Sequence, residues 1–339
     1  MQARVLGRAW ILDLSKFLAS GHGIGPQAGG SPVLLIGIRF RDVNLLVIVV
    51  ASFTVNRAQS VPPANNLDPP GRPYVIGIVN ITEDSFSDGG RYLAAEAALR
   101  HARQLRSDGA DIIELGPAAS HPESLRVTAE DERSRLGPVL GPLTADGVPV
   151  SVDSFLPETQ RFAISAGVSY LNDIQGFPYP DLYETLAASG CQLIVMHSVQ
   201  RSGPATRGVG DPVAVLAGID QFFATRLRAL EAAGIKRDRL IIDPGLGYFL
   251  GSNPEPSVAV LAGIRNLKSR FGVPVLVSPS RKSFLRTLTG RDVAHAGSAT
   301  LAAELYATWQ GVDYIRTHDV TALRDALKIL TAITDQRLP

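Results

Sequence analysis

The chain has 339 residues, of which 45% are hydrophobic and 19% are charged, and its formal net charge is +1. This is ordinary composition for a globular protein with a large core, and no field of one charge sign favours nucleic acid or a membrane surface as a partner. The single cysteine, Cys191, excludes an internal disulfide and fits a reducing compartment. We therefore expect no nucleic-acid partner, no membrane partner and a cytoplasmic location.

Residues 1–73 differ from the rest of the chain and are expected to form an irregular extension. Glycine and proline interrupt residues 21–32, and "VPPANNLDPPGRP" at 61–73 is typical of an extended linker. Between them, the apolar run 43–55 is short for a membrane span. Three alternatives stay open for this extension: a mis-assigned start of the reading frame, a disordered or weakly folded segment, or a targeting segment.

From residue 74 to residue 339, short apolar runs alternate with segments of helical periodicity. The runs are rich in β-branched residues and predict strands at 75–79, 112–115, 148–152, 169–171, 191–196, 240–242, 274–277 and 313–316. Because these runs are apolar on successive residues, they are typical of parallel strands that are covered on both faces.

The clearest helix is predicted for 212–233, with Asp211 as its N-cap, Pro212 at its first position and Gly234 beyond its end. The remaining helical predictions are 157–166, 257–271, 298–310, 321–332 and a broken helix at 128–146, which contains two Gly-Pro pairs. Eight strands alternating with helices predict an α/β fold of the (β/α)8 barrel type. A doubly wound sheet shares this alternation, but no G-x-G-x-x-G fingerprint follows the first strand.

Polar residues stand where most of the predicted strands stop. They are Asn80, Asp153, Asn172, Asp173, His197, Asp243, Ser280, Arg281, Lys282, Arg316 and His318. One such residue is explained by helix capping, but Lys and Arg are poor N-caps because a cation opposes the helix dipole. Cations after the seventh and eighth strands therefore indicate a bound anion, at the place where barrels of this type commonly bind phosphate.

The residue types divide this mouth of the barrel into two parts. Asp153, Asn172 and Asp243 can pair with a flat heterocycle that has several N–H donors, and Lys282 can donate to a ring acceptor. The second part suits a di- or triphosphate that shares its oxygens with a divalent ion, and its residues are Asn80, Arg316 and His318. A polyphosphate leaving group needs no protein nucleophile, because stabilising its charge is itself catalysis.

Several of these segments resemble the signatures of dihydropteroate synthases, and they follow the family's order. They are "GIVNITEDSFSDGG", "SVDS", "YLNDIQGF", "IVMHS", "IIDPGLGYF", "SPSRKSF" and "DYIRTHDV", and the resemblance covers residues 74–330. It implies a (β/α)8 barrel and a transferase that joins 6-hydroxymethyl-7,8-dihydropterin diphosphate to p-aminobenzoate and releases diphosphate, in folate biosynthesis.

The resemblance also implies a role for each matching residue. Lys282, Asp153, Arg316 and His318 would be the catalytic set. The pterin would be held by Asp153, Asn172, Asp243 and Lys282, with Met196 and Phe249 lining its slot. Arg316 and His318 would hold the diphosphate, and Asn80 would help to place Mg²⁺. Near the p-aminobenzoate would lie Phe86, Ser120, Pro122, Arg281 and Ser283. The segment 80–90 would be a mobile loop that closes over both groups.

One segment departs from the family pattern. After the second strand, "GPAASHPES" at 116–124 replaces the usual Gly-Gly-Glu-Ser-Thr-Arg-Pro-Gly, and His121 stands where the family usually has Arg. This segment is similar to the mobile, sulfonamide-resistant branch of the family, so we expect sulfonamide insensitivity. An aromatic residue after Ser283, Phe284, is a candidate for crowding the sulfonamide substituent; the alternative is that it belongs to the core.

Two other classes of function share the pterin-binding residues. One is a methyltransferase-type pterin-binding barrel, which has no diphosphate to hold, and the other is a non-catalytic pterin-binding homologue, which would lose the first loop or Lys282. The chain keeps "SRK" at 280–282 and "RTH" at 316–318, and this favours the transferase. We also expect a homodimer, although no sequence pattern here determines the oligomeric state.

Overall fold

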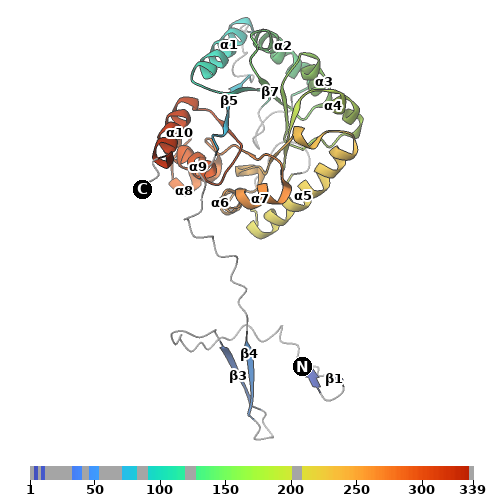
Figure 1. Cartoon of the computed structure of the whole chain (residues 1–339), viewed down its shortest axis with the longest axis vertical. Helices are drawn as coiled ribbons and strands as arrows, with labels where there is room; N and C mark the ends of the chain where they lie inside the picture. Colours follow the sequence, from blue (N-terminus) through green and yellow to red (C-terminus); the bar gives the residue numbers. More distant parts are fainter. Residues whose placement is uncertain are drawn as a thin grey trace. The chain divides into compact units, whose positions relative to one another are not determined.

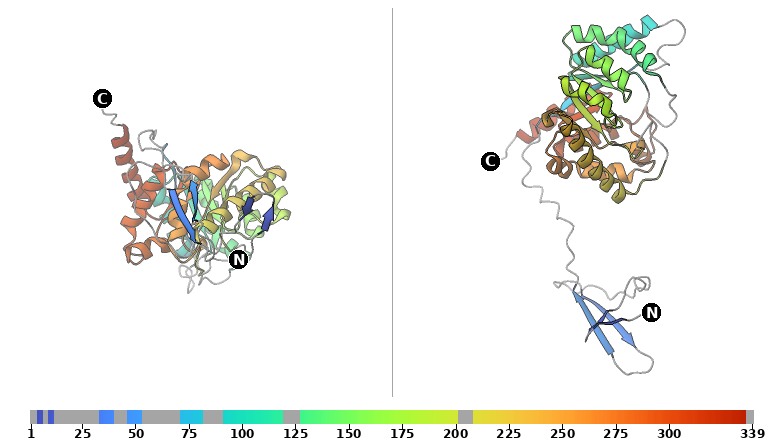
Figure 2. Two further views of the ribbon diagram at one scale, coloured as in Figure 1. Left: turned by 90° about the horizontal axis from the view of Figure 1, so that it is seen from below. Right: turned by 90° about the vertical axis from the view of Figure 1, so that its right-hand side faces the viewer.

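The computed structural model describes residues 71–81, 91–118, 127–200 and 208–335, and, before residue 71, four strands alone. The chain forms two compact units, Met1–Leu67 and Asp68–Pro339. In the first unit, β1 (Arg4–Leu6) pairs antiparallel with β2 (Ala9–Ile11), and β3 (Val33–Arg39) pairs antiparallel with β4 (Leu46–Ser52) (Figure 2). The apolar run at 43–55 thus contains β4.

Eight parallel strands build the second unit. They are β5 (Tyr74–Asn80), β6 (Ile112–Gly116), β7 (Val150–Asp153), β8 (Tyr170–Asp173), β9 (Gln192–Met196), β10 (Leu240–Asp243), β11 (Leu276–Val277) and β12 (Tyr314–Thr317). Their order in the sheet is β10-β9-β8-β7-β6-β5-β12-β11, and a parallel bridge between Ile242 and Val275 joins the two ends. The predicted (β/α)8 barrel is confirmed, and each predicted strand lies within about two residues of its position.

Helices surround these strands as an outer ring (Figure 1). They are α1 (Arg91–Ser107), α2 (Ala129–Ala145), α3 (Pro157–Ser165), α4 (Tyr183–Ala188), α5 (Pro212–Ala232), α6 (Glu255–Ala262), α7 (Ile264–Phe271), α8 (Ser283–Thr289), α9 (Gly297–Trp309) and α10 (Val320–Asp335). Helix α5 begins as predicted, because Asp211 caps it by accepting the backbone N–H of Ala214, and it ends just before Gly234, which has φ of 87°. In the described connections lie the 3-10 turns Pro180–Leu182, Arg237–Arg239 and Gly247–Phe249.

Two helix predictions were wrong. Helix α2 is continuous although it contains Pro138 and Pro142, each of which costs ~3 kcal/mol inside a helix. Four of its side chains (Leu136, Val139, Leu140 and Leu143) are fully buried, and each contributes about 1.5–3 kcal/mol, which offsets that cost. Conversely, the single helix predicted at 257–271 is two helices, because the backbone leaves helical geometry at Gly263.

Strand residues alternate between the barrel interior and the helix layer. The inward residues towards the amino ends of the strands form one apolar cluster, which consists of Ile76, Ile112, Ile194, Ile241, Leu276 and Tyr314. Their outward neighbours pack against the helices in a larger core cluster, to which the buried thiol of Cys191 also belongs. The barrel interior at the amino ends of the strands is therefore filled with side chains, and space for a ligand remains at their carboxyl ends.

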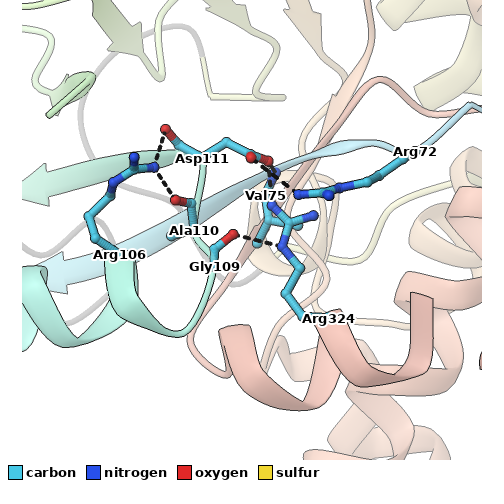
Figure 3. Close-up of polar contacts among 7 residues, drawn as sticks. All are labelled: Arg72, Val75, Arg106, Gly109, Ala110, Asp111 and Arg324. Carbon is cyan, nitrogen blue, oxygen red and sulfur yellow. Dashed lines mark hydrogen bonds and ion pairs between the residues drawn. The ribbon is translucent and has the colours of Figure 1, made fainter. Parts of the chain in front are cut away.

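Two aspartates secure the amino ends of the strands by the same arrangement, which we call the basal clasps. Asp111 precedes β6, and its carboxylate accepts the backbone N–H of Val75 in β5 at 2.7 Å. Arg324 of α10 pairs with this carboxylate and also donates to the carbonyl oxygen of Gly109 at 2.7 Å (Figure 3). Nearby, Arg106 donates to the carbonyl oxygen of Asp111 at 2.9 Å.

The second basal clasp repeats this pattern between β12 and the start of β11. Asp313 precedes β12, and its carboxylate accepts the backbone N–H of Val275 at 2.9 Å. Lys268 of α7 pairs with Asp313 at 2.6 Å and donates to the carbonyl oxygen of Gly311 at 2.9 Å. Each clasp is thus a Gly-x-Asp sequence that joins two strands and a helix cation.

Candidate active site

The predicted polar residues converge at the carboxyl ends of the strands. Three of them line one cavity together with apolar and small residues; the lining is Ile174, Met196, Asp243, Gly245, Leu246, Phe249, Ser278, Lys282 and Arg316. Asp153 and Asn172 lie beside one another in the register of β7 and β8. This juxtaposition follows from the parallel barrel, because it brings every strand end to the same rim.

Arg316 connects the two neighbouring acidic groups at the centre of this site. Its guanidinium group donates to Asp153 Oδ2 at 3.0 Å and forms an ion pair with Glu114. The Glu114 carboxylate also accepts the hydroxyl of Ser151 at 2.9 Å. A guanidinium has five N–H donors, so these contacts leave donors for a ligand.

Glu114 was missed as a site residue by the sequence analysis. It is fully buried, and burial raises its pKa to about 7, against the opposing effect of Arg316 and with a further contribution from Asp153. The signal was present, because a glutamate interrupts the otherwise apolar strand sequence "IIELG". A charged residue in a fully buried strand requires a partner, and Arg316 is that partner.

Asp243 ends β10 and is held by the loop that follows it. Its Oδ1 accepts the backbone N–H of Gly245 at 2.8 Å, and burial raises its pKa to about 6 although that bond favours the charged form. Gly245 has φ of 74°, and a Cβ atom there would lie 2.5 Å from the carbonyl oxygen of His197. Glycine is therefore required for this loop to present the Asp243 carboxylate to the cavity.

The side-chain amide of Asn172 is buried with unpaired polar atoms. The side chain is fully buried at the end of β8. Neither its amide nitrogen nor its amide oxygen has a hydrogen-bond partner among the described residues. Because unpaired buried polar groups cost about 1–3 kcal/mol, this amide is suited to a ligand that supplies both a donor and an acceptor.

Three apolar side chains line the same cavity as Asp243, Lys282 and Arg316. Ile174, Met196 and Phe249 form a separate buried cluster, with Phe155 and Tyr248 packed against it. Lys282 lies over the Phe249 ring, with its Nζ atom 5.0 Å from the ring centroid. Burial, followed by the positive charge of Arg316, lowers the pKa of Lys282 to about 8. The lysine therefore remains mostly charged at neutral pH.

His318 and Ser280 connect the loops that follow β11 and β12. Ser280 Oγ lies 2.9 Å from His318 Nδ1. Burial, and after it the nearby cations Arg281, Arg316 and Lys282, together lower the pKa of His318 to about 3. The imidazole is therefore neutral at pH 7, and the cations beside it favour a bound anion.

The residues predicted near p-aminobenzoate divide into two groups. Arg281 is exposed and has φ of 58°, whereas Ser283 begins α8, is 7% exposed and has no partner for its hydroxyl among the described residues. The other predicted residues, Phe86, Ser120 and Pro122, lie outside the described residues, as do His121 and most of the first loop. Asn80 ends β5, opposite Gly116, with its side chain exposed at the rim.

The hypothesis for Phe284 is not supported. Its side chain is 2% exposed and belongs to the core cluster between the strands and the helices. It is therefore a core residue of α8, the alternative that the sequence left open, and it does not line the cavity.

A second layer of hydrogen bonds fixes the strand ends from outside the barrel. Ser154, next to Asp153, donates to the buried carboxylate of Glu132 at 2.6 Å. Gln160 donates both to the Ser154 carbonyl oxygen at 2.7 Å and to Asp173 Oδ2 at 2.8 Å. The outward Asp173 thus serves the scaffold, whereas its neighbour Asn172 faces inward.

Comparison with known proteins agrees with this geometry. Residues 76–318 match the family described as pterin binding enzyme. The chain is 54% identical over 261 residues to dihydropteroate synthase type-2 of Escherichia coli, which spans 77% of this chain and 96% of that protein. The chain belongs to the dihydropteroate synthase family of pterin-binding enzymes. This is the family that the sequence motifs predicted.

Two further comparisons place the chain within this family. It is 51% identical over 259 residues to dihydropteroate synthase type-3 of Escherichia coli, which covers 76% of this chain and 98% of that protein. The structure of Xanthomonas albilineans dihydropteroate synthase with 4-aminobenzoic acid superposes with a TM-score of 0.71 and 38% identity, covering 79% of this chain and 94% of that one. Among the described residues, none of the helices is long and apolar enough to cross a membrane.

Proposed function

We propose that this protein is a dihydropteroate synthase that joins 6-hydroxymethyl-7,8-dihydropterin diphosphate to p-aminobenzoate. The observation that carries the proposal is the meeting, at one rim, of heterocycle-binding groups (Asp153, Asn172 and Asp243) with the cations of the last two strand ends. Membership of the family and its relatives of about 50% identity support this assignment. The proposed enzyme is a transferase of folate biosynthesis.

The pterin fits the inner part of the site by chemical complementarity. Its amino and ring N–H groups are donors, and the carboxylates of Asp243 and Asp153 are acceptors. The unpaired amide of Asn172 supplies one donor and one acceptor, and Lys282 donates to a ring acceptor. Met196 and Phe249 cover the flat face of the ring. Binding would satisfy polar atoms that otherwise remain buried without partners.

The reaction needs charge stabilisation more than a protein nucleophile. The amine of p-aminobenzoate attacks the methylene carbon of the pterin, a C–N bond forms, the C–O bond to diphosphate breaks, and the amine loses a proton. Negative charge grows on the departing diphosphate, next to Lys282, Arg316 and His318. The preorganised cations Lys282 and Arg316 lower the activation barrier, because they need no rearrangement during the step.

The family implies a magnesium ion, and the rim fits an ion that the protein and the substrate diphosphate hold together. No group of three or more His, Cys, Asp or Glu side chains suited to a metal occurs among the described residues. Asn80 offers an exposed side-chain oxygen, and Mg²⁺ is commonly held by one or two protein oxygens together with substrate phosphates. When bound, the ion would neutralise diphosphate charge. Asn80→Ala should then raise the Mg²⁺ concentration needed for half-maximal rate.

We further propose that the enzyme is insensitive to sulfonamides. The support is the segment 116–124, which departs from the usual family pattern, together with the similarity to the type-2 and type-3 synthases. The test is growth of a synthase-deficient strain carrying this gene, with and without sulfamethoxazole, alongside the inhibition constant of the purified enzyme. Growth without the drug but not with it would reject insensitivity and keep the synthase activity.

The synthase activity itself is tested by incubating purified protein with both substrates and Mg²⁺ and measuring diphosphate release. Release that requires both substrates supports the proposal. The methyltransferase-type and non-catalytic alternatives predict pterin binding without release, so calorimetry of pterin binding on the same sample distinguishes them from misfolded protein.

A homodimer and a cytoplasmic location complete the proposal. Cys191 is buried and unpaired, as suits a reducing compartment. Light scattering of the purified chain tests the first, and fractionation of cells that express it tests the second.

A further inference from the structure

The turn that follows β8 has two consecutive residues in the left-handed region of backbone geometry. Gly176 has φ of 69° and Phe177 has φ of 59°. Glycine is required at the first of them, because a Cβ atom on Gly176 would lie 2.6 Å from the ring of Phe222. Phe177 is 1% exposed and belongs to the core cluster. A buried phenylalanine keeps such a conformation only where the surrounding structure holds it.

Two side chains of the helix layer hold this turn at the carbonyl group of Phe177. Its oxygen accepts a hydrogen bond from Nη1 of Arg226, in α5, at 2.8 Å and another from the hydroxyl of Tyr183, at the start of α4, at 3.1 Å. Arg226 Nη1 also donates to the Tyr183 hydroxyl oxygen at 3.1 Å, so the three groups form a closed triangle. We call Arg226 and Tyr183 the loop clamp.

The same turn carries part of the apolar lining of the candidate active site. Ile174 directly follows β8 and lines the cavity. Between Ile174 and Phe177 the chain is fixed to Asp173, whose carbonyl oxygen accepts the backbone N–H of Gly176 at 2.9 Å. The Asp173 Oδ1 atom also accepts the backbone N–H of Gln175 at 2.7 Å. Because these bonds make the turn one rigid unit, the position of Phe177 determines where Ile174 lies.

The loop clamp acts on the site from outside the cavity. Among the described residues that line the cavity, neither Arg226 nor Tyr183 occurs. The guanidinium group of Arg226 instead lies over the Phe222 ring, 5.8 Å from its centroid. The loop clamp is also separate from the cations that follow β11 and β12. Its loss should therefore disturb the apolar lining and leave the groups beside the diphosphate in place.

We propose that Arg226 and Tyr183 are positioning residues for the pterin, which hold the left-handed turn at Phe177 and thereby the Ile174 side of the pterin slot. The kinetic consequence rests on the proposed synthase function, whereas the effect on the turn follows from the contacts alone. Since Ile174 would contact the pterin ring before and during the reaction, weaker contact raises KM and leaves kcat almost unchanged.

Three variants of the loop clamp test the kinetic consequence. Arg226→Met keeps the length of the side chain but removes its hydrogen bonds, and it should raise KM and the calorimetric Kd for the pterin diphosphate about fivefold to tenfold, with kcat within about twofold of wild type. Arg226→Lys keeps a charged donor and should hold both constants within about threefold of wild type. Tyr183→Phe loses the hydroxyl alone and should raise them about twofold to threefold.

Arg239 offers a matched control at another end of α4. It is half-buried like Arg226, and it donates to the backbone carbonyl oxygens of Leu186 and Cys191, at 2.8 Å in each case. These contacts lie at the end of α4 and before β9, away from the turn. Arg239→Met should lower the melting temperature and leave KM for the pterin diphosphate unchanged. An equal rise of KM in both Met variants would overturn the proposal, because general destabilisation would explain it.

Amide hydrogen exchange tests the effect on the turn without relying on turnover. In Arg226→Met, a peptide covering 174–178 should exchange faster than in wild type, and in Arg239→Met it should not. If Arg226→Met does not fold, Tyr183→Phe receives the same tests. Unchanged exchange of this peptide, or a fall of kcat at unchanged KM, would overturn the proposal. A wild-type protein without turnover would reject the synthase function, and the exchange data would then decide the role of the loop clamp.

Discussion

At the amino ends of the barrel strands, Asp111 and Asp313 each accept a hydrogen bond from a backbone N–H group and form an ion pair with a cation of a helix. At the carboxyl ends, the amide of Asn172 has no partner among the described residues, and burial raises the pKa of Glu114 and Asp243. Both ends combine carboxylates with Lys and Arg. They differ in whether the protein itself satisfies these groups.

This difference indicates that the amino ends of the strands serve the stability of the barrel and that the carboxyl ends serve its chemistry. A carboxylate that is satisfied by its own fold contributes to stability and has no reason to bind anything else. Buried groups that stay unpaired or have shifted pKa values are costly for the fold and are typical of binding sites. Substitutions at the two ends should therefore have opposite signatures, in melting temperature at the amino end and in kinetics at the carboxyl end.

The largest effect is expected for Lys282→Ala. Loss of a cation beside both the pterin and the departing diphosphate should lower kcat/KM by about a hundredfold or more. The melting temperature should change little, because burial of the lysine disfavours its charged form. Lys268→Ala, in the second basal clasp, is the matched control and should change the melting temperature while activity persists. Activity of Lys282→Ala within a few-fold of wild type would reject its site role.

A somewhat smaller effect is expected for Glu114→Leu. It leaves Arg316 without its buried partner, so the guanidinium group should lose its orientation, and kcat/KM should fall about tenfold or more. Ser151→Ala removes just one hydrogen bond to Glu114 and should cost far less. The measurement is steady-state kinetics with the pterin diphosphate as the varied substrate. Equal losses in the two variants would show that the buried ion pair is not what matters.

The pH profile should reveal the titration of Lys282. Its ammonium group is charged below a pKa of about 8 and neutral above it, so kcat/KM should fall as the pH rises through about 8. Arginine stays charged, and Lys282→Arg should move this alkaline limb up by about one pH unit or more if it retains activity. Glu304 also has a pKa near 8, so Glu304→Gln is the control and should keep the wild-type limb.

At the amino end, Asp111→Ala should affect stability alone. It leaves the backbone N–H of Val75 and the buried Arg324 without their acceptor, a loss of about 1–3 kcal/mol. For a domain of this size that corresponds to a drop of roughly 3–10 °C in melting temperature. Calorimetry and kinetics below the transition check both parts. A large fall in kcat/KM at unchanged melting temperature would contradict the separation of the two ends.

The smallest effect is expected from deleting residues 1–70. They lie almost entirely outside the compact unit Asp68–Pro339, and no predicted site residue is among them. Keeping Arg72 preserves its contact with Asp111. Melting temperature and kcat/KM should match those of the full chain. A fall of many degrees would show that the extension stabilises the barrel.

Much of this organisation could be predicted from the sequence. The strands were predictable because each is a short apolar run, and the parallel barrel then brings Asp153, Asp243 and Lys282 to one rim. Glu114 was not predicted because the candidate residues stand at strand ends, whereas this residue faces inward from the middle of a strand. Its partner, Arg316, lies far away in sequence, so the ion pair depends on the closed barrel.

The remaining errors also come from tertiary packing. Local sequence predicted a break in α2 at its Gly-Pro pairs, but the burial of four apolar side chains keeps the helix continuous. The position of Phe284 after Ser283 suggested a site residue, and packing places it in the core. The two Gly-x-Asp clasps were not predicted, because their function requires the helix cations that the fold supplies.

The most direct test follows dihydropteroate formation and thermal unfolding side by side in three proteins: wild type, Lys282→Ala and Asp111→Ala. The account predicts product from wild type with both substrates, near-complete loss of product at an unchanged melting temperature for Lys282→Ala, and the reverse for Asp111→Ala. A wild-type protein that is folded and binds the pterin but forms no dihydropteroate would contradict the central claim.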